Sequence, residues 1–429
     1  MQKLPTFGLR GLPLLAQLAI SCLTTAPLHA LILYSGLNSE NLSAPDSERE
    51  AIFDAVASVC NSSGSSRNGS AVRIRGKYML TARHVSTNSH VTFDGSTFWA
   101  RDTAFTPITF DDVDLKLFKL IEDPGITEIE LHSSDAGDDV SSGFSGGRPP
   151  FNLISTEVTG TLVGWGRGSS ENGSGFVEGD DQTWTWANTY SKRWGTNRID
   201  STPAISGLDD YDYSYTGLSI DLDSDAGTDE AGLAVHDSGS GIFVENDGIW
   251  RLAGIATLVT TDGSSTFGSS EQDSNFFVRI SSYASEIEAA IPDLNTLSGW
   301  KTDHSLYNAD ADNDADTDGD GISQLLEYAL GGDPNVNDTS ILPHSTLVEE
   351  NGNQYLELSL TRPTGLTGIS YLPQTSSDLN NWPSDSSGIV DASPTPSDNG
   401  DGTETLIYRR SQAVTASDQA FIRIEVIEN

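Results

Sequence analysis

The sequence predicts an all-β protein with more than one domain, and three observations lead to that prediction. From residue 31 to about residue 294, short apolar runs alternate with turn residues such as Asp94-Gly95 and Asp247-Gly248, which is typical of β-sandwiches and β-barrels. The composition changes at Asn308, after which aspartates occupy every second position up to Asp320. Beyond Gly332-Asp333-Pro334 a strand-like alternation returns, so a second, smaller β unit is expected.

The first thirty residues are typical of a secretory signal peptide. Lys3 and Arg10 precede an apolar stretch from Leu12 to Leu23, and Leu28-His29-Ala30 offers a small residue at a cleavage point. The stretch is too short and too interrupted for a membrane-spanning helix. A non-cleaved anchor and a lipid anchor on Cys22 are the alternatives. We therefore expect residues 1–30 to be removed, the protein to be secreted, and no later segment to span a membrane.

Charge and cysteine content narrow the choice of partners. The formal net charge is −39, and loss of the leader removes two further positive charges. Such a surface repels phosphates, so no nucleic acid is expected as a partner. The repulsion among the surface charges is best tolerated in surroundings where salt screens it. Only Cys60 remains in the mature chain, so no internal disulfide is expected and stability depends on core size and metal.

A helix is expected to close the large β region. Tyr283, Ile287 and Ile291 recur at helical spacing between Ser282 and Ile291. Pro292 follows and would stop the helix. We take residues 31–294 as one domain, and residues 295–307 as a polar linker.

Three motifs in this domain carry the residue types of nucleophilic catalysis. His84 lies in Leu80-Thr81-Ala82-Arg83-His84-Val85, Asp114 precedes an apolar strand, and Ser238 lies in His236-Asp237-Ser238-Gly239-Ser240-Gly241. A serine hydroxyl is a weak nucleophile, so it needs an imidazole to take its proton and a carboxylate to hold that imidazole. The order His, Asp, Ser differs from that of subtilisins and α/β-hydrolases.

Each of these residues also has a structural interpretation. Alone, His84 would be a hydrogen-bonded structural histidine, Asp114 a charge at a strand edge, and Ser238 part of a Gly/Ser turn. Asp112 competes with Asp114 for the carboxylate role. The phase of the leucines that follow (Leu115, Leu117 and Leu120) places Asp114 at the start of the strand, which favours Asp114.

With these motifs, residues 31–294 resemble a trypsin-like (S1, chymotrypsin-fold) serine peptidase of the secreted bacterial type. Gly164-Trp165-Gly166 falls at the family's Gly-Trp-Gly turn, Gly254-Ile255-Ala256 is similar to the strand beside the substrate, and the segment 277–283 resembles the start of the final helix. The resemblance implies a chymotrypsin-like double β-barrel with a C-terminal helix. It also implies a serine-type endopeptidase that cleaves proteins or peptides through His84, Asp114, Ser238 and an acyl-enzyme, without a catalytic cofactor.

The resemblance further implies an oxyanion hole built from the backbone N–H groups of His236 and Ser238. The family has glycine at the first of these positions, and a histidine with positive φ is uncommon. A catalytically inactive binding or adhesion protein is therefore the alternative, and an esterase the third hypothesis. The family uses the residue at Asp237 to bind a freed N-terminal amine. Whether signal cleavage supplies that amine or Asp237 is satisfied locally stays open.

The specificity pocket implied by the family would include Gly232, Thr257 and Val259. Gly232 replaces the aspartate that would pair with a substrate Lys or Arg, although Asp229 and Glu230 are close by. Val259 would narrow the mouth of the pocket. We expect small or apolar residues at the cleavage position.

Residues 308–336 are predicted to bind calcium. The stretch from Asp316 to Glu327 fits a twelve-residue calcium loop, with glycine at the sixth position and an acid at the twelfth. The alternating aspartates are similar to EF-hand, thrombospondin type 3 and dockerin-like repeats. A disordered acidic linker is the alternative. The expected ligands of a structural Ca²⁺ are Asp316, Asp318, Asp320, the carbonyl of Ile322, Gln324 and Glu327.

Residues 343–429 are predicted to form a small β-sandwich-like module. Leu356, Leu358 and Leu360 alternate with polar residues, as in half-buried strands. The aromatic residues Trp382, Tyr355 and Tyr371 suggest a sugar-stacking face, although such residues more often belong to the core of a small β module. The expected ligand of the module is a surface or polymer, by analogy of architecture alone.

Overall fold

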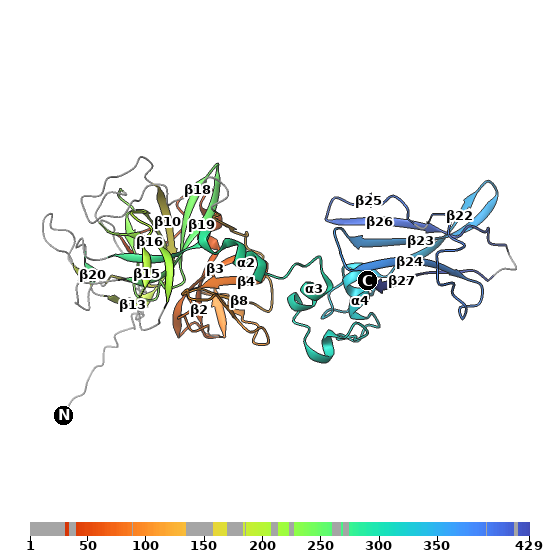
Figure 1. Ribbon diagram of the computed structural model, residues 1–429, viewed down its shortest axis with the longest axis horizontal. Coiled ribbons are helices and arrows are strands. Elements are labelled where there is room, and N and C mark those ends of the chain that lie inside the picture. Colours follow the sequence, from red (N-terminus) through yellow and green to blue (C-terminus); the bar gives the residue numbers. More distant parts are fainter. Residues whose placement is uncertain are drawn as a thin grey trace, which may run out of the picture.

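The computed structural model describes residues 31–33, 40–87, 89–133, 158–169, 183–184, 186–206, 213–222, 227–259, 267–268, 274–391, 393–415 and 419–429. The expected signal peptide lies outside these residues. Figure 1 shows two β-rich parts joined by a segment that contains two short helices, α3 and α4. No helix in the described part of the chain is long and apolar enough to cross a membrane.

The first β-rich part begins with a sheet of seven antiparallel strands, counted over the described residues, in the order β6-β5-β2-β3-β4-β8-β7. Short apolar runs form these strands, and β2 is buried at every position. Helix α1 (Glu50–Asp54) precedes them. The strands are β2 (Val56–Cys60), β3 (Arg67–Arg75), β4 (Tyr78–Thr81), β5 (His90–Thr92), β6 (Trp99–Ala100), β7 (Ile108–Thr109) and β8 (Lys116–Lys119).

A second sheet has eight strands within the described ranges, in the order β14-β10-β18-β19-β21-β16-β15, with β9 beside β19. Its strands are β9 (Glu130–Leu131), β10 (Thr159–Gly164), β14 (Arg193–Arg198), β15 (Ala204–Ser206), β16 (Ser214–Ile220), β18 (Gly241–Asn246), β19 (Ile249–Val259) and β21 (Asn275–Arg279). Three short pairs flank it: β1 (Ile32–Leu33) with β17 (Ala231–Gly232), β11 (Arg167–Ser169) with β13 (Trp186–Tyr190), and β12 (Thr183–Trp184) with β20 (Phe267–Gly268).

The two sheets share one continuous apolar core. Leu80 and Leu117 of the first sheet belong to the same buried cluster as Phe243 and Ile255 of the second, so the free energy of burying apolar surface holds the sheets together. The expected closing helix is present as the 3₁₀ turn η2 (Ile280–Ser282) and helix α2 (Ala284–Ala290). The predicted predominance of β structure is confirmed, while closure of the two sheets into barrels stays a prediction.

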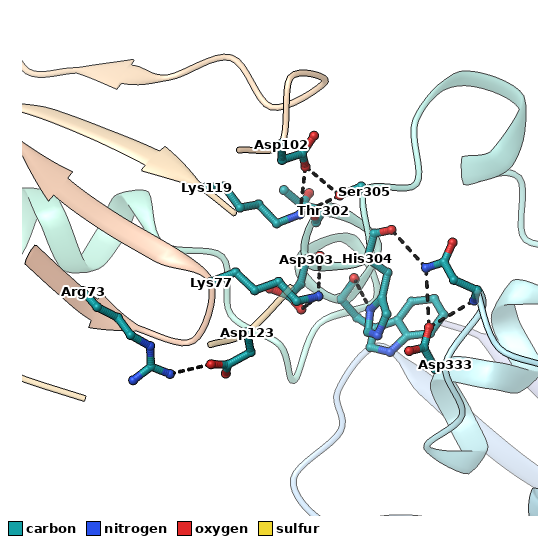
Figure 2. Close-up of polar contacts among 12 residues, drawn as sticks. Arg73, Lys77, Asp102, Lys119, Asp123, Thr302, Asp303, His304, Ser305 and Asp333 are labelled. Atoms are coloured by element: carbon teal, nitrogen blue, oxygen red, sulfur yellow. Dashed lines mark hydrogen bonds and ion pairs between the residues drawn. The ribbon is translucent and has the colours of Figure 1, made fainter. Parts of the chain in front are cut away.

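Residues 295–307, expected as a linker, contain helix α3 (Leu297–Asp303), which contacts the first sheet (Figure 2). Lys119 Nζ at the end of β8 donates to Asp102 Oδ2 at 3.2 Å and to Ser305 Oγ at 2.9 Å. Ser305 Oγ also donates to Asp102 Oδ2 at 2.6 Å. Lys77 Nζ lies 3.0 Å from the Asp303 carboxylate. The segment is therefore held against the sheet by polar contacts.

The remaining residues form the acidic segment and the C-terminal module. The helices are η3 (Asn308–Ala311), α4 (Gln324–Leu330) and η4 (Thr339–Ile341). A four-stranded sheet, as far as the structure describes it, contains β22 (His344–Glu350), β23 (Asn353–Pro363), β26 (Thr403–Arg409) and β25 (Ser397–Asp398), and a two-stranded sheet pairs β24 (Ile369–Ser376) with β27 (Phe421–Glu428). Tyr328 of α4 packs with Leu297 and Trp300 of α3, so α3 and α4 share a small apolar core.

Candidate active site

His84 and Asp114 meet where β4 ends and β8 begins. His84 Nδ1 lies 2.6 Å from Asp114 Oδ2, and the backbone N–H of His84 donates to Asp114 Oδ1 at 3.0 Å. The carboxylate is buried, since Asp114 is 1% exposed, while the His84 side chain keeps 27% of its surface exposed. Asp112, the competing carboxylate, is exposed and has a φ of +55°. A buried carboxylate on one ring nitrogen orients the imidazole and leaves Nε2 for proton transfer.

Lys116 is a residue at this site that the sequence motifs did not single out. Its Nζ donates to the carbonyl of Arg83 at 3.0 Å and to the carbonyl of Val85 at 2.5 Å, so it joins the two peptide groups that flank His84. Burial lowers the pKa of Lys116 to about 8, and the charge of Asp114 opposes that shift. The sequence feature that could have revealed Lys116 is its position two residues after Asp114, because residues at this spacing in an extended chain have their side chains on the same side.

The loop that carries Ser238 docks on the first sheet close to His84. The backbone N–H of Ser70 donates to the carbonyl of Ser238 at 2.8 Å, and Thr81 Oγ1, three residues before His84, donates to the carbonyl of Ser70 at 2.7 Å. Gly239 has a φ of +87°, and a Cβ there would lie 2.0 Å from the Ser70 carbonyl oxygen. Glycine is therefore required after Ser238 for this close approach.

The Ser238 hydroxyl forms no hydrogen bond with any described residue. In enzymes without substrate, the contact between nucleophile and base is often long and tightens only in the complex. Among the described residues, no group accepts a hydrogen bond from the backbone N–H of Ser238 or of His236 either. Within the described ranges, both predicted oxyanion-hole donors thus lack a hydrogen-bond acceptor.

His236 adopts the backbone conformation that a glycine would reach freely. Its φ is +73°, and its ring lies edge-on to Tyr190 with 5.3 Å between ring centroids. Burial, followed by the nearby charge of Arg167, lowers the pKa of His236. The substitution is accommodated in this fold at the cost of a strained φ.

Asp237 is fully buried beneath this loop. Its carboxylate accepts the backbone N–H groups of Gly166 at 2.6 Å, Ala234 at 2.8 Å and Leu31 at 3.2 Å. A Cβ on Gly166 would lie 2.6 Å from the carboxylate, which explains the glycine in the Gly-Trp-Gly turn. Burial raises the pKa of Asp237 to about 7, and Arg193, which donates to the carbonyl of Leu31 at 2.9 Å, opposes that shift.

Comparison with known proteins identifies no family for this chain. No family model matches it, and no curated protein matches its sequence. Among solved structures, the chain is similar to neuropsin, a serine protease expressed in the limbic system of mouse brain, with a TM-score of 0.36 and 13% identity over 55% of this chain and 94% of that chain.

The three predicted specificity residues do not surround one described cavity. Gly232 is buried in β17, where it pairs with Ile32 of β1. Val259 packs against the apolar cluster that contains Ile32. Thr257 is buried, and its Oγ1 lies 3.0 Å from the hydroxyl of Tyr215. Residues 223–226 and 260–266, on either side of these positions, lie outside the described part of the chain.

The acidic segment folds into a tight loop. Asp316 Oδ1 accepts the backbone N–H of Gly319 at 2.9 Å, and Asp316 Oδ2 accepts that of Gly321 at 3.0 Å. Gly321, at the sixth position of the predicted loop, has a φ of +90°. Carboxylate oxygens of Asp316, Asp318 and Asp320 lie within 4.8 Å of one another. Gln324 is buried, and its Oε1 has no hydrogen-bond partner among the described groups. These residues fit a hard, oxygen-seeking cation.

Each of the three aromatic residues singled out in the C-terminal module has contacts within the protein. Tyr371 donates its hydroxyl to the carbonyl of Ala329 in α4 at 2.7 Å. Arginines stack over the other two rings, Arg409 over Tyr355 and Arg423 over Trp382. The sugar-stacking face stays a hypothesis.

Proposed function

We propose that this chain is a secreted serine endopeptidase that cleaves protein or peptide substrates. The observation that carries the proposal is the 2.6 Å contact between His84 Nδ1 and the buried Asp114 carboxylate, next to a strained loop that presents Ser238. The hydrogen bonds from Ser70 to Ser238 and from Thr81 to Ser70 support it, because they connect the loop of Ser238 to strand β4, which ends three residues before His84.

In the proposed reaction, Ser238 Oγ attacks the substrate carbonyl while His84 takes the hydroxyl proton. Asp114 holds the ring in the required tautomer and stabilises the imidazolium that forms. The N–H groups of His236 and Ser238 donate to the oxyanion of the tetrahedral intermediate. His84 then gives its proton to the leaving amine, and water hydrolyses the acyl-enzyme by the same steps in reverse.

The proposed preference is for small or apolar residues at the cleavage position. Gly232 provides no carboxylate for a basic substrate side chain, and Val259 is an apolar side chain of the predicted pocket. Burial of a substrate methylene in such a site gives about a tenfold preference. Export through the leader at residues 1–30 belongs to the same proposal.

The proposal also includes a structural Ca²⁺ in the acidic loop. Asp316, Asp318 and Asp320 would hold the ion through carboxylates, with Ile322, Gln324 and Glu327 completing the predicted set. The unpartnered, buried oxygen of Gln324 supports this. The ion would stiffen the connection between the two β-rich parts.

The deciding experiment is active-site labelling of the mature chain with a fluorescent fluorophosphonate in the presence of calcium. Ser238→Ala is expected to remove the label and lower peptide hydrolysis by about 10⁶-fold. Ser240→Ala is the matched control, because Ser240 is a buried serine in the same loop, and it is expected to keep the label. Folded wild-type protein that takes no label would instead favour an inactive binding protein, with the strained His236 as the physical cause.

A further inference from the structure

Glu327 is a buried carboxylate whose oxygens have no protein partners. The residue is 1% exposed, and neither Oε1 nor Oε2 accepts a hydrogen bond from any described group. A buried charge without a partner is costly, so such a group normally binds a cation or a proton. The burial of this carboxylate therefore requires an explanation other than the packing of helix α4.

Two further carboxylates point into the same place. Oxygens of Asp320, Glu327 and Asp338 lie within 4.8 Å of one another. Asp320 Oδ2 accepts the backbone N–H of Asp338 at 3.1 Å, and Asp338 Oδ2 accepts that of Asp333 at 3.1 Å. The second oxygen of Asp338, Oδ1, is buried and has no partner within the described residues. Three carboxylates thus converge, and backbone N–H groups fix two of them.

The surroundings of these carboxylates supply no positive charge. The Glu327 carboxylate packs against Gly332, where a Cβ would lie 1.6 Å from Glu327 Oε2, so glycine is required for this position of the carboxylate. No described lysine, arginine or histidine forms an ion pair with Asp320, Glu327 or Asp338. Three ionised carboxylates this close together repel one another. A divalent cation would offset this repulsion.

We propose that Asp320, Glu327 and Asp338 bind a calcium ion, with Asp338 as a ligand from outside the twelve-residue loop. All the protein ligands are oxygens, which suits a hard cation, and a bidentate Glu327 with waters would complete the six to eight ligands of calcium. This inference rests on the proposed calcium loop and extends it: Asp320 and Glu327 belong to the predicted ligand set, and Asp338 is a ligand that the twelve-residue loop does not contain.

The ion would connect the calcium loop, helix α4 and the turn before η4. Tyr328, next to Glu327, packs into the core shared with α3, and Tyr371 of the C-terminal module bonds to Ala329. Cation binding at Glu327 therefore stabilises the point where the C-terminal module joins the rest of the chain. The site does not depend on peptidase activity.

The test is isothermal titration of calcium into the full chain after removal of metal with EGTA. It is done in the Ser238→Ala background, so that its result is separate from the fate of the proposed peptidase. Asp338→Asn keeps an acceptor for the Asp333 N–H and is expected to bind one calcium fewer per chain, or to bind it at least about tenfold more weakly.

Asp314→Asn is the matched control, since Asp314 is an exposed aspartate of the same acidic run that belongs to neither group of carboxylates. It is expected to titrate like the parent chain. Glu327→Gln is a second variant, with near-ultraviolet circular dichroism to establish that both variants fold. Titration of folded Asp338→Asn and Glu327→Gln with the stoichiometry and affinity of the parent would overturn the site.

Discussion

At the scale of single residues, buried polar contacts hold the candidate site in place. Asp114 orients His84 directly, while Lys116 bonds to the carbonyls of the residues on either side of the histidine. In the proposed reaction His236 contributes a backbone N–H rather than its ring, and its φ is +73°. Positioning by buried polar contacts matters because small displacements of a catalytic group cost much of the rate.

Lys116→Met is expected to lower kcat by about 100-fold with little change in KM, because the backbone on both sides of His84 loses the hydrogen bonds that hold it in place. Steady-state kinetics on a peptide substrate would measure this. Lys192→Met is the matched control: Lys192 is also buried and donates to two carbonyls, those of Asp54 and Phe93, but does so away from His84. An equal loss of stability in both variants with no fall in kcat would show that Lys116 is merely structural.

At the scale of elements, the short strand β1 connects the start of the described chain to the nucleophile loop. Leu31 is fully buried, its N–H donates to Asp237, and its carbonyl accepts from Arg193. Ile32 pairs with Gly232. If cleavage after Ala30 frees the Leu31 amine, that amine becomes an ammonium group beside a buried carboxylate, and no separate activating cleavage is needed.

We therefore expect a chain that starts at Leu31 to be more stable and more active near pH 7.5 than one with two extra residues in front. Asp237 alone has a raised pKa of about 7, so in the extended chain its contribution to stability falls as the pH rises from about 4 through 7. In the chain that starts at Leu31, the terminal ammonium group gains Asp237 as a partner, so the pKa of that amine rises above about 8. The contribution of the amine to stability is then lost only at higher pH.

Thermal unfolding and peptide hydrolysis, measured from about pH 5 to about pH 10, would show the difference between the two chains. Breaking a buried ion pair costs about 3–5 kcal/mol. The difference in stability between the two chains should therefore be large at neutral pH and disappear at alkaline pH. Identical pH profiles for the two chains would show that Asp237 is satisfied by backbone N–H groups alone.

At the scale of the whole molecule, strand β8 follows Asp114 and ends at the junction with α3. Lys119, its last residue, is completely buried and bonds to Asp102 and Ser305. Helix α3 in turn shares an apolar core with α4. The first β-rich part and the acidic segment are thus joined by a polar contact on one side of α3 and an apolar contact on the other.

Ser305→Ala is expected to destabilise this junction by about 1.5–3 kcal/mol, because it removes a hydrogen bond to the buried charge of Asp102. Urea unfolding followed by tryptophan fluorescence, which reports on Trp300 in α3, would measure the loss. Ser298→Ala is the control on the same helix, since Ser298 is exposed. The same midpoint in both variants would contradict a role for Ser305 in docking.

At the candidate site, residue patterns in the sequence predicted some features and missed others. The phase of Leu115, Leu117 and Leu120 placed Asp114 rather than Asp112 at the start of the apolar strand, and in the structure Asp114 is buried while Asp112 is exposed. The helix predicted between residues 282 and 291 is present as α2. Lys116, Arg193 and Asp338 were not predicted, because each acts through contacts with segments far away in the chain.

The sequence by itself determined the predominance of β structure, the closing helix and the motifs around His84, Asp114 and Ser238, since periodicity, turn residues and local motifs are short-range properties. The tertiary structure decided which partners these residues have. Leu31 meets Asp237 across 206 residues, and Asp338 meets Glu327 only because α4 ends in a turn at Gly331, with a φ of +80°. Such contacts depend on how the elements pack, and the packing free energy is summed over the whole chain.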